Sequence, residues 1–158
     1  MSREYRNALS CFATGVTVVT TQYAHTDWGM TCNSFASVSL EPRMVLWSIR
    51  KNANSHAAFT QGLGYTVNVL TSDQEALAMQ FAKGSLEDRF ADVDMQRLDS
   101  GRLKLNQALA WFDCSLVQVV SAGDHDILLG EVQHFGWSDQ SPLLFAQSKF
   151  GQMATSLV

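Results

Sequence analysis

The residues best suited to chemistry begin with a run of small, hydroxyl-rich side chains at positions 29–42, GMTCNSFASVSLEP. Thr31, Asn33 and Ser34 offer hydrogen-bond donors and acceptors without net charge. Their small neighbours allow the backbone to approach a ligand closely. The run therefore suits a polar heterocycle carrying a polyhydroxyl chain. The alternative is an edge strand whose Ser and Thr side chains simply face water.

Two further polar segments accompany this run. Residues 48–55, SIRKNANS, place Lys51 and Ser55 where a strand meets a helix start, and exposed helix N–H groups there favour phosphate. The alternative is an ordinary solvated helix cap. The third segment, Gly123 to His125, precedes a strand. Its alternative interpretation is a tight hairpin shaped by Asp124.

Several other kinds of site are excluded by the sequence. No P-loop is present, and the glycines of residues 62–64 precede a strand and lack the third glycine of a dinucleotide fingerprint. Cys32 and Cys114 are expected to fill small packing roles rather than to act as nucleophiles. No metal site is predicted, because the four histidines are scattered without ligand spacing: His25, His56, His125 and His134.

The composition narrows the class of protein. The 158 residues suit one domain. Charged residues make up 16%, below the average of roughly 25%, so we expect a partner subunit or ligand to cover part of the surface. A net charge of −4 argues against nucleic acid. There is no membrane-length apolar run, the start lacks a signal peptide's apolar region, and the three cysteines suit a reducing compartment. A cytoplasmic location is expected.

Hydrophobic periodicity and turn residues predict many strands and few helices. Helices are expected over 2–12, with Ser2 as cap, over 52–61, and over 72–84, opened by a Ser72/Glu75 capping box. A turn or helical fragment is expected at 87–90. Residues 23–28 and 92–106 are expected to be irregular connections. Strands are expected at 16–21, 30–40 (running into a loop), 44–49, 65–70, 110–120, 127–137 and 142–145.

This order of elements favours one fold class. Strands and helices do not alternate strictly, so a doubly wound parallel sheet is disfavoured. A closed, mainly antiparallel barrel with peripheral helices fits better.

The ordered set of motifs resembles the flavin reductase-like family, the FMN-binding split barrels that serve as reductase components of two-component flavin-dependent monooxygenases. The resemblance covers nearly all of residues 1–158 as a single domain. The motifs that carry it are RNAL at 6–9, FATGVTVVTT at 12–21, GMTCNSF at 29–35, SVSLEP at 37–42, VNVL at 67–70, DQ at 73–74, DRF at 88–90, LAWFDC at 109–114, GDH at 123–125, GEV at 130–132 and PLLF at 142–145.

The resemblance implies a six-stranded antiparallel split β-barrel with a few short helices, assembled as a homodimer with flavin near the subunit interface. It implies an NAD(P)H-dependent flavin reductase of the EC 1.5.1 type, with NADH or NADPH reducing FMN or FAD for a separate oxygenase. One alternative is a flavoprotein that retains its flavin and reduces ferric iron or a quinone. Another is a non-catalytic flavin-binding domain.

The resemblance also implies site residues by position. His125 would orient the nicotinamide without acting as a general base, with Phe145 and Phe150 nearby. Cys32 stands where many relatives have alanine. The residues implied to contact flavin are Met30, Thr31, Asn33, Ser34, Ser48, Lys51, Asn54, Ser55, Ala82 and Lys83.

Overall fold

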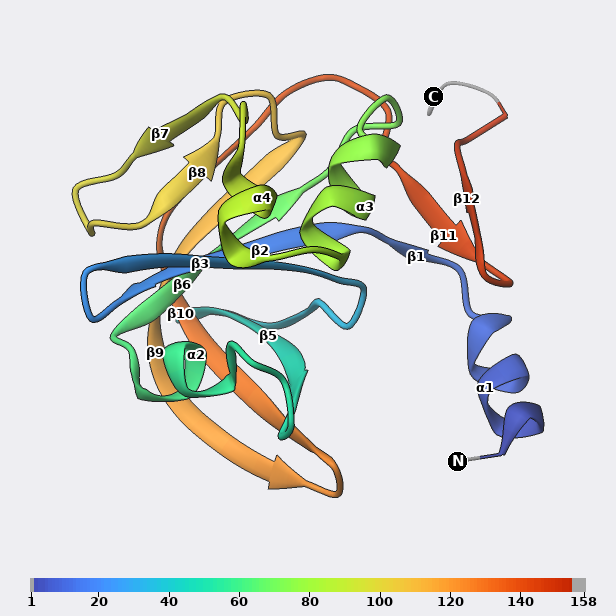
Figure 1. Cartoon of the computed structure of the whole chain (residues 1–158), viewed down its shortest axis with the longest axis horizontal. Helices are drawn as coiled ribbons and strands as arrows, with labels where there is room; N and C mark the ends of the chain where they lie inside the picture. Colours follow the sequence, from blue (N-terminus) through green and yellow to red (C-terminus); the bar gives the residue numbers. More distant parts are fainter. Residues whose placement is uncertain (1, 155–158) are drawn as a thin grey trace.

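The computed structural model describes residues 2–154, and its main feature is one curved antiparallel sheet of seven strands (Figure 1). The strand order is β3-β2-β6-β9-β10-β5-β4. The strands span Thr17–Tyr23 (β2), Thr26–Cys32 (β3), Ala36–Leu40 (β4), Arg43–Arg50 (β5), Gly64–Val69 (β6), Ala110–Ala122 (β9) and His125–Trp137 (β10).

Smaller elements surround this sheet. Helices α3 and α4 lie against β3, α2 lies against β2, and α1 extends from the body beside β11 and β12 (Figure 1). The helices span Arg3–Ser10 (α1), His56–Gln61 (α2), Glu75–Ala82 (α3) and Leu86–Phe90 (α4). A three-stranded sheet joins Thr14–Gly15 (β1), Leu144–Ala146 (β11) and Lys149–Gly151 (β12), and a hairpin joins Met95–Arg97 (β7) and Leu103–Leu105 (β8).

The sheet curls around a core to which strands from both of its halves contribute. Trp47 of β5 packs edge-on against Phe59 of α2 and Tyr65 of β6, with ring centroids 4.8 and 5.9 Å apart. Leu128 of β10 joins the same cluster, and its carbonyl accepts a hydrogen bond from the Tyr65 hydroxyl at 3.0 Å. Gly130 is required here, because a Cβ at that position would collide with the Tyr65 hydroxyl.

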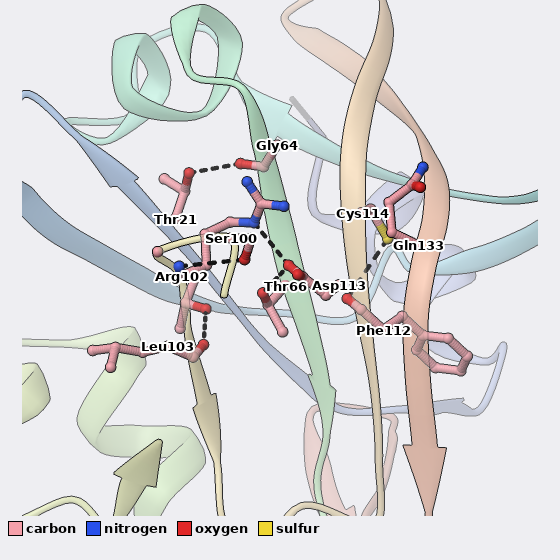
Figure 2. A network of polar contacts seen from close by, with 12 residues as sticks. Thr21, Gly64, Thr66, Ser100, Arg102, Leu103, Phe112, Asp113, Cys114 and Gln133 are labelled. Atoms are coloured by element: carbon pink, nitrogen blue, oxygen red, sulfur yellow. Dashed lines mark hydrogen bonds and ion pairs between the residues drawn. The ribbon is translucent and has the colours of Figure 1, made fainter. Parts of the chain in front are cut away.

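A buried polar network fastens the β7–β8 hairpin to the sheet. Asp113 of β9 accepts hydrogen bonds from Thr66 and from Arg102, both at 2.8 Å, and Figure 2 shows the three side chains converging. Because a buried charge is costly without a partner, this arrangement fixes where the hairpin lies.

The prediction of a mainly β chain with few helices is confirmed, but the six-stranded closed barrel is not what the structure has. The segment expected as one strand over 30–40 is two strands, β3 and β4. Residues 33–35 cross between them, and the two strands form opposite edges of the seven-stranded sheet.

Two of the expected irregular connections are also partly wrong. Residues 23–28 contain the start of β3, and a two-residue turn at Ala24 and His25, with φ of 52° and 64°, closes a hairpin with β2. Such turns need positive φ at both central residues. Residues 92–106 contain the β7–β8 hairpin.

The helix predictions are confirmed only in part. Ser2 caps α1 as expected, accepting from the Tyr5 N–H at 3.1 Å. The Ser72/Glu75 capping box does not form: α3 begins at Glu75, and the Ser72 N–H donates to the Ser141 carbonyl instead. The turn or helical fragment at 87–90 falls within α4. No helix in residues 2–154 is long and apolar enough to cross a membrane.

Candidate functional site

A cleft of about 520 Å³ opens between β3, α3, α4 and the start of α2. It brings together five of the predicted flavin-contacting residues from three separate parts of the chain: Met30, Thr31, Asn54, Ser55 and Ala82. The other residues of its lining are Trp28, Ala53, Phe81, Gly84, Ser85, Leu86 and Arg89. The volume lies within the range of roughly 300–1,000 Å³ that is usual for small-molecule sites.

Hydrogen bonds within the chain fix two walls of the cleft. The Thr31 hydroxyl donates to the Ala78 carbonyl at 2.6 Å, which ties β3 to α3. The Ser55 hydroxyl donates to the Met30 sulfur at 3.6 Å, which ties the start of α2 to β3. Both hydroxyl protons are thus engaged, so toward a ligand these oxygens act as acceptors.

The other five residues predicted to contact flavin lie outside the cleft lining, and three of them are on the loop after β3 or on β5. The Ser34 hydroxyl accepts from the Ser48 N–H at 2.9 Å and donates to the Ser48 carbonyl at 3.2 Å, so these two residues bridge the loop after β3 to β5. Asn33 is exposed on the same loop.

The predicted lysines also stand apart from the cleft. The Lys51 ammonium donates to the Ser121 hydroxyl at 2.6 Å, and Lys83 is exposed at the end of α3. The cation that lines the cleft is Arg89 of α4, which sequence reasoning did not single out as a ligand contact. Its Nη1 donates to the Gly29 carbonyl at 2.9 Å. The sequence feature that points to Arg89 is its place in the DRF motif at 88–90.

His125 begins β10 at the tip of the β9–β10 hairpin and is not part of the cleft lining. Its Nδ1 lies 2.7 Å from a carboxylate oxygen of Asp124. This hydrogen bond, and then the charge of His125, lowers the pKa of Asp124. The Lys51 N–H donates to the Asp124 carbonyl at 3.0 Å, so the hairpin tip contacts the segment that leads into the cleft wall.

The two predicted nicotinamide-contacting phenylalanines lie elsewhere. Phe145 and Phe150 pack together on β11 and β12, with ring centroids 5.2 Å apart. In Figure 1 these strands are well separated from the tip of the β9–β10 hairpin. A single chain therefore does not bring Phe145 and Phe150 to His125.

Neither Cys32 nor Cys114 is activated as a nucleophile. Burial raises the pKa of Cys32, whose sulfur lies 3.1 Å from the Thr17 hydroxyl, and raises that of Cys114 to about 12. A thiol held protonated is a poor nucleophile. Among residues 2–154 there is no group of three or more His, Cys, Asp or Glu that could hold a metal ion.

Comparison with known protein families identifies the family of this chain. The sequence profile described as "Flavin reductase like domain" matches residues 9–154. The chain belongs to this flavin reductase-like family. It is 41% identical over 153 residues to the FMN reductase (NADH) SmoA of Agrobacterium fabrum, covering 97% of this chain and 87% of SmoA. It is 42% identical to the reductase component of the flavin-dependent trigonelline monooxygenase of Acinetobacter baylyi, covering 84% of this chain but only 43% of that protein.

Solved structures of the flavin reductase-like family share the fold. The flavin reductase PheA2 in its native state is 40% identical, with a TM-score of 0.88 over 98% of this chain and all of that one. The NADH:FAD oxidoreductase SgcE6 of Streptomyces globisporus, in complex with NAD and FAD fragments, is 36% identical, with a TM-score of 0.90 over 96% of this chain and 92% of that chain.

The cleft residues fit the flavin of a flavin reductase-like protein. The Nε of Arg89 and the indole Nε1 of Trp28 belong to cleft-lining residues, are buried, and have no hydrogen-bond partner in the described part of the chain. Unpaired buried donors are uncommon in folded proteins. Apart from Arg89 the lining is uncharged, as a neutral aromatic heterocycle requires.

Proposed function

We propose that this chain is an NAD(P)H:flavin oxidoreductase that binds FMN or FAD in the cleft between β3, α3 and the start of α2. The observation that carries the proposal is that five predicted residues converge on one cleft whose lining is uncharged apart from Arg89: Met30, Thr31, Asn54, Ser55 and Ala82. The reductase names of the relatives, SmoA and SgcE6 among them, support it.

When bound, flavin supplies the acceptor for a hydride delivered by reduced nicotinamide. The chain's own residues bind the flavin and orient the nicotinamide. Thr31 and Ser55 offer hydroxyl oxygens as acceptors, and Asn54 offers an amide donor. Arg89 offers the positive charge that a flavin phosphate requires. His125 orients the nicotinamide through its ring, which is held by Asp124. No side chain breaks a covalent bond.

The working form we propose is a homodimer. Helix α1 presents Tyr5 and Leu9, Phe12 follows just after the helix ends, and each of the three side chains is more than half exposed in the single chain. Such an apolar surface usually packs against another protein surface. A second copy also offers a way to bring Phe145 and Phe150 to the His125 of its neighbour. Light scattering after gel filtration tests this: twice the chain mass is expected, and a Phe12→Glu variant should shift toward the monomer.

We further propose that the reduced flavin leaves to serve a separate flavin-dependent oxygenase in the cytoplasm, where NAD(P)H is available. The names of several relatives as reductase components of monooxygenases support this role. The competing possibility is a flavoprotein that retains its flavin for another acceptor. Dialysis separates them: a colourless protein is expected here, whereas a preparation that stays yellow would favour retained flavin.

The reaction itself is tested by following NADH and NADPH at 340 nm with FMN, FAD or riboflavin, and without flavin. We expect oxidation of at least one pyridine nucleotide that depends on added flavin and on enzyme concentration. Absence of oxidation with every combination, in protein shown to be folded by circular dichroism, would overturn the proposal.

A further inference from the structure

A second His–Asp contact lies close to the cleft but outside the set of predicted site residues. His56, the first residue of α2, places its Nε2 2.6 Å from a carboxylate oxygen of Asp126. Asp126 directly follows His125 on β10. The contact therefore joins two elements that the proposed reaction uses, although 70 positions separate them in the sequence.

The side chain of Asp126 is only 11% exposed. Along β10, Asp126 shares the buried alternation of Leu128 and Val132, and the preceding residue, His125, lies on the opposite face. A carboxylate on the core side of a strand requires a hydrogen-bonding partner. His56 is the partner that the described structure provides, and the pair is partly buried, with the His56 side chain 27% exposed.

His56 also continues directly from the cleft wall. Ala53, Asn54 and Ser55 line the cleft, and the His56 N–H donates to the Ala53 carbonyl at 3.1 Å. Fixing the His56 ring to β10 therefore fixes where this wall stands relative to the strand that begins with His125.

We propose that His56 and Asp126 are a positioning pair, which holds the Ala53–Ser55 wall in register with His125. This role rests on the proposed reductase function. Hydride transfer requires reacting atoms within about 3–3.5 Å of each other, so a small shift of one wall reduces the rate strongly. The pair touches neither substrate in this account and acts through its neighbours.

The test compares His56→Leu, which removes the hydrogen bond, with His56→Gln, whose amide can still donate to Asp126. A double variant, His56→Leu/Asp126→Leu, leaves no buried carboxylate unpaired and so protects the fold. His134→Leu, at an exposed histidine of β10, is the matched control. Three quantities are measured: the anaerobic flavin reduction rate at saturating NADH, the flavin Kd, and amide hydrogen exchange of residues 51–61 in flavin-free protein.

We expect the reduction rate to fall on the order of tenfold in His56→Leu and in the double variant, with a smaller rise in flavin Kd and faster exchange of the wall amides. His56→Gln and His134→Leu should stay within about twofold of wild type. Wild-type rates in the double variant, or an equal loss in His56→Gln, would overturn the positioning role alone. If the wild-type protein reduces no flavin, the proposed function is overturned, and this role in hydride transfer is overturned with it. Amide hydrogen exchange distinguishes the two failures, because it reports whether the contact holds the wall without requiring activity.

Discussion

Arg102 donates from Nε to Asp113 Oδ1 at 2.8 Å, and the two side chains are only 9% and 2% exposed. Removing the carboxylate leaves the guanidinium buried without a partner. We therefore expect Asp113→Ala to lower the free energy of unfolding by about 3–5 kcal/mol, measured by urea denaturation. The control is Asp27→Ala, which breaks the more exposed pair with Arg97 and should cost about 1 kcal/mol or less. Equal losses in the two variants would contradict this account of the network.

A glycine on β3 sets the spacing between the sheet and the helices that line the cleft. A Cβ at Gly29 would lie 2.8 Å from a ring carbon of Phe81 and 3.0 Å from one of Phe90. Gly29→Ala should push α3 and α4 outward, raise the flavin Kd on the order of tenfold, and lower stability by about 1–3 kcal/mol. Gly15→Ala, where a Cβ meets nothing within 4 Å, is the control for both measurements. An unchanged Kd in Gly29→Ala would refute this packing argument.

The buried thiol of Cys114 should make the free energy of unfolding depend on pH in the alkaline range. Burial raises its pKa from 9.0 to about 12, so between these values the unfolded chain releases a proton that the folded chain keeps. Stability must then fall as pH rises, by up to about 1.4 kcal/mol per pH unit from this group. Urea midpoints at pH 8.5 to 11 should show a shallower decline in Cys114→Ala. The exposed Cys11→Ala should follow wild type, and identical slopes in all three proteins would be inconsistent with a protonated Cys114.

His125 is predicted to act on the nicotinamide side of the reaction. Its ring is held by Asp124 at the tip of the β9–β10 hairpin, away from the lining of the cleft. His125→Ala should therefore raise the KM for NADH on the order of tenfold while the flavin Kd changes less than about twofold. Steady-state kinetics with fluorescence titration of flavin measure both. Equal losses of affinity for flavin and NADH would contradict the assignment.

The sequence predicts much of the local structure, because local signals are strong where strands are β-branched. Residues 16–21 and 65–70 become β2 and β6 nearly as expected. The strand count could not be obtained in the same way. Nothing in the composition of residues 30–40 marks the point at Asn33 where the chain leaves one sheet edge for the other, since that crossing is set by distant strand pairing.

The candidate site was predicted in part for a similar reason. Motif resemblance supplied Met30, Thr31, Asn54, Ser55 and Ala82, which the fold brings to one cleft. It did not assign a role to Arg89, because only the packing of α4 on β3 brings that side chain to the cleft. The sequence assigns His56 no role, because it is one of four histidines scattered without ligand spacing. Its contact with Asp126 depends on where the fold places the start of α2 relative to β10, and local sequence spacing does not reveal it.

The most direct test of the flavin site is to fill the cleft. Ala82 lines it and is exposed, so Ala82→Trp should occupy the cleft at little cost in folding. Ala76→Trp, at an exposed position of α3 outside the lining, is the matched control. The measurement is the anaerobic rate of flavin reduction by NADH, at a fixed flavin concentration near the wild-type Kd. We expect Ala82→Trp to lose nearly all of the rate and Ala76→Trp to retain it; an Ala82→Trp protein as fast as wild type would contradict the placement of flavin in this cleft.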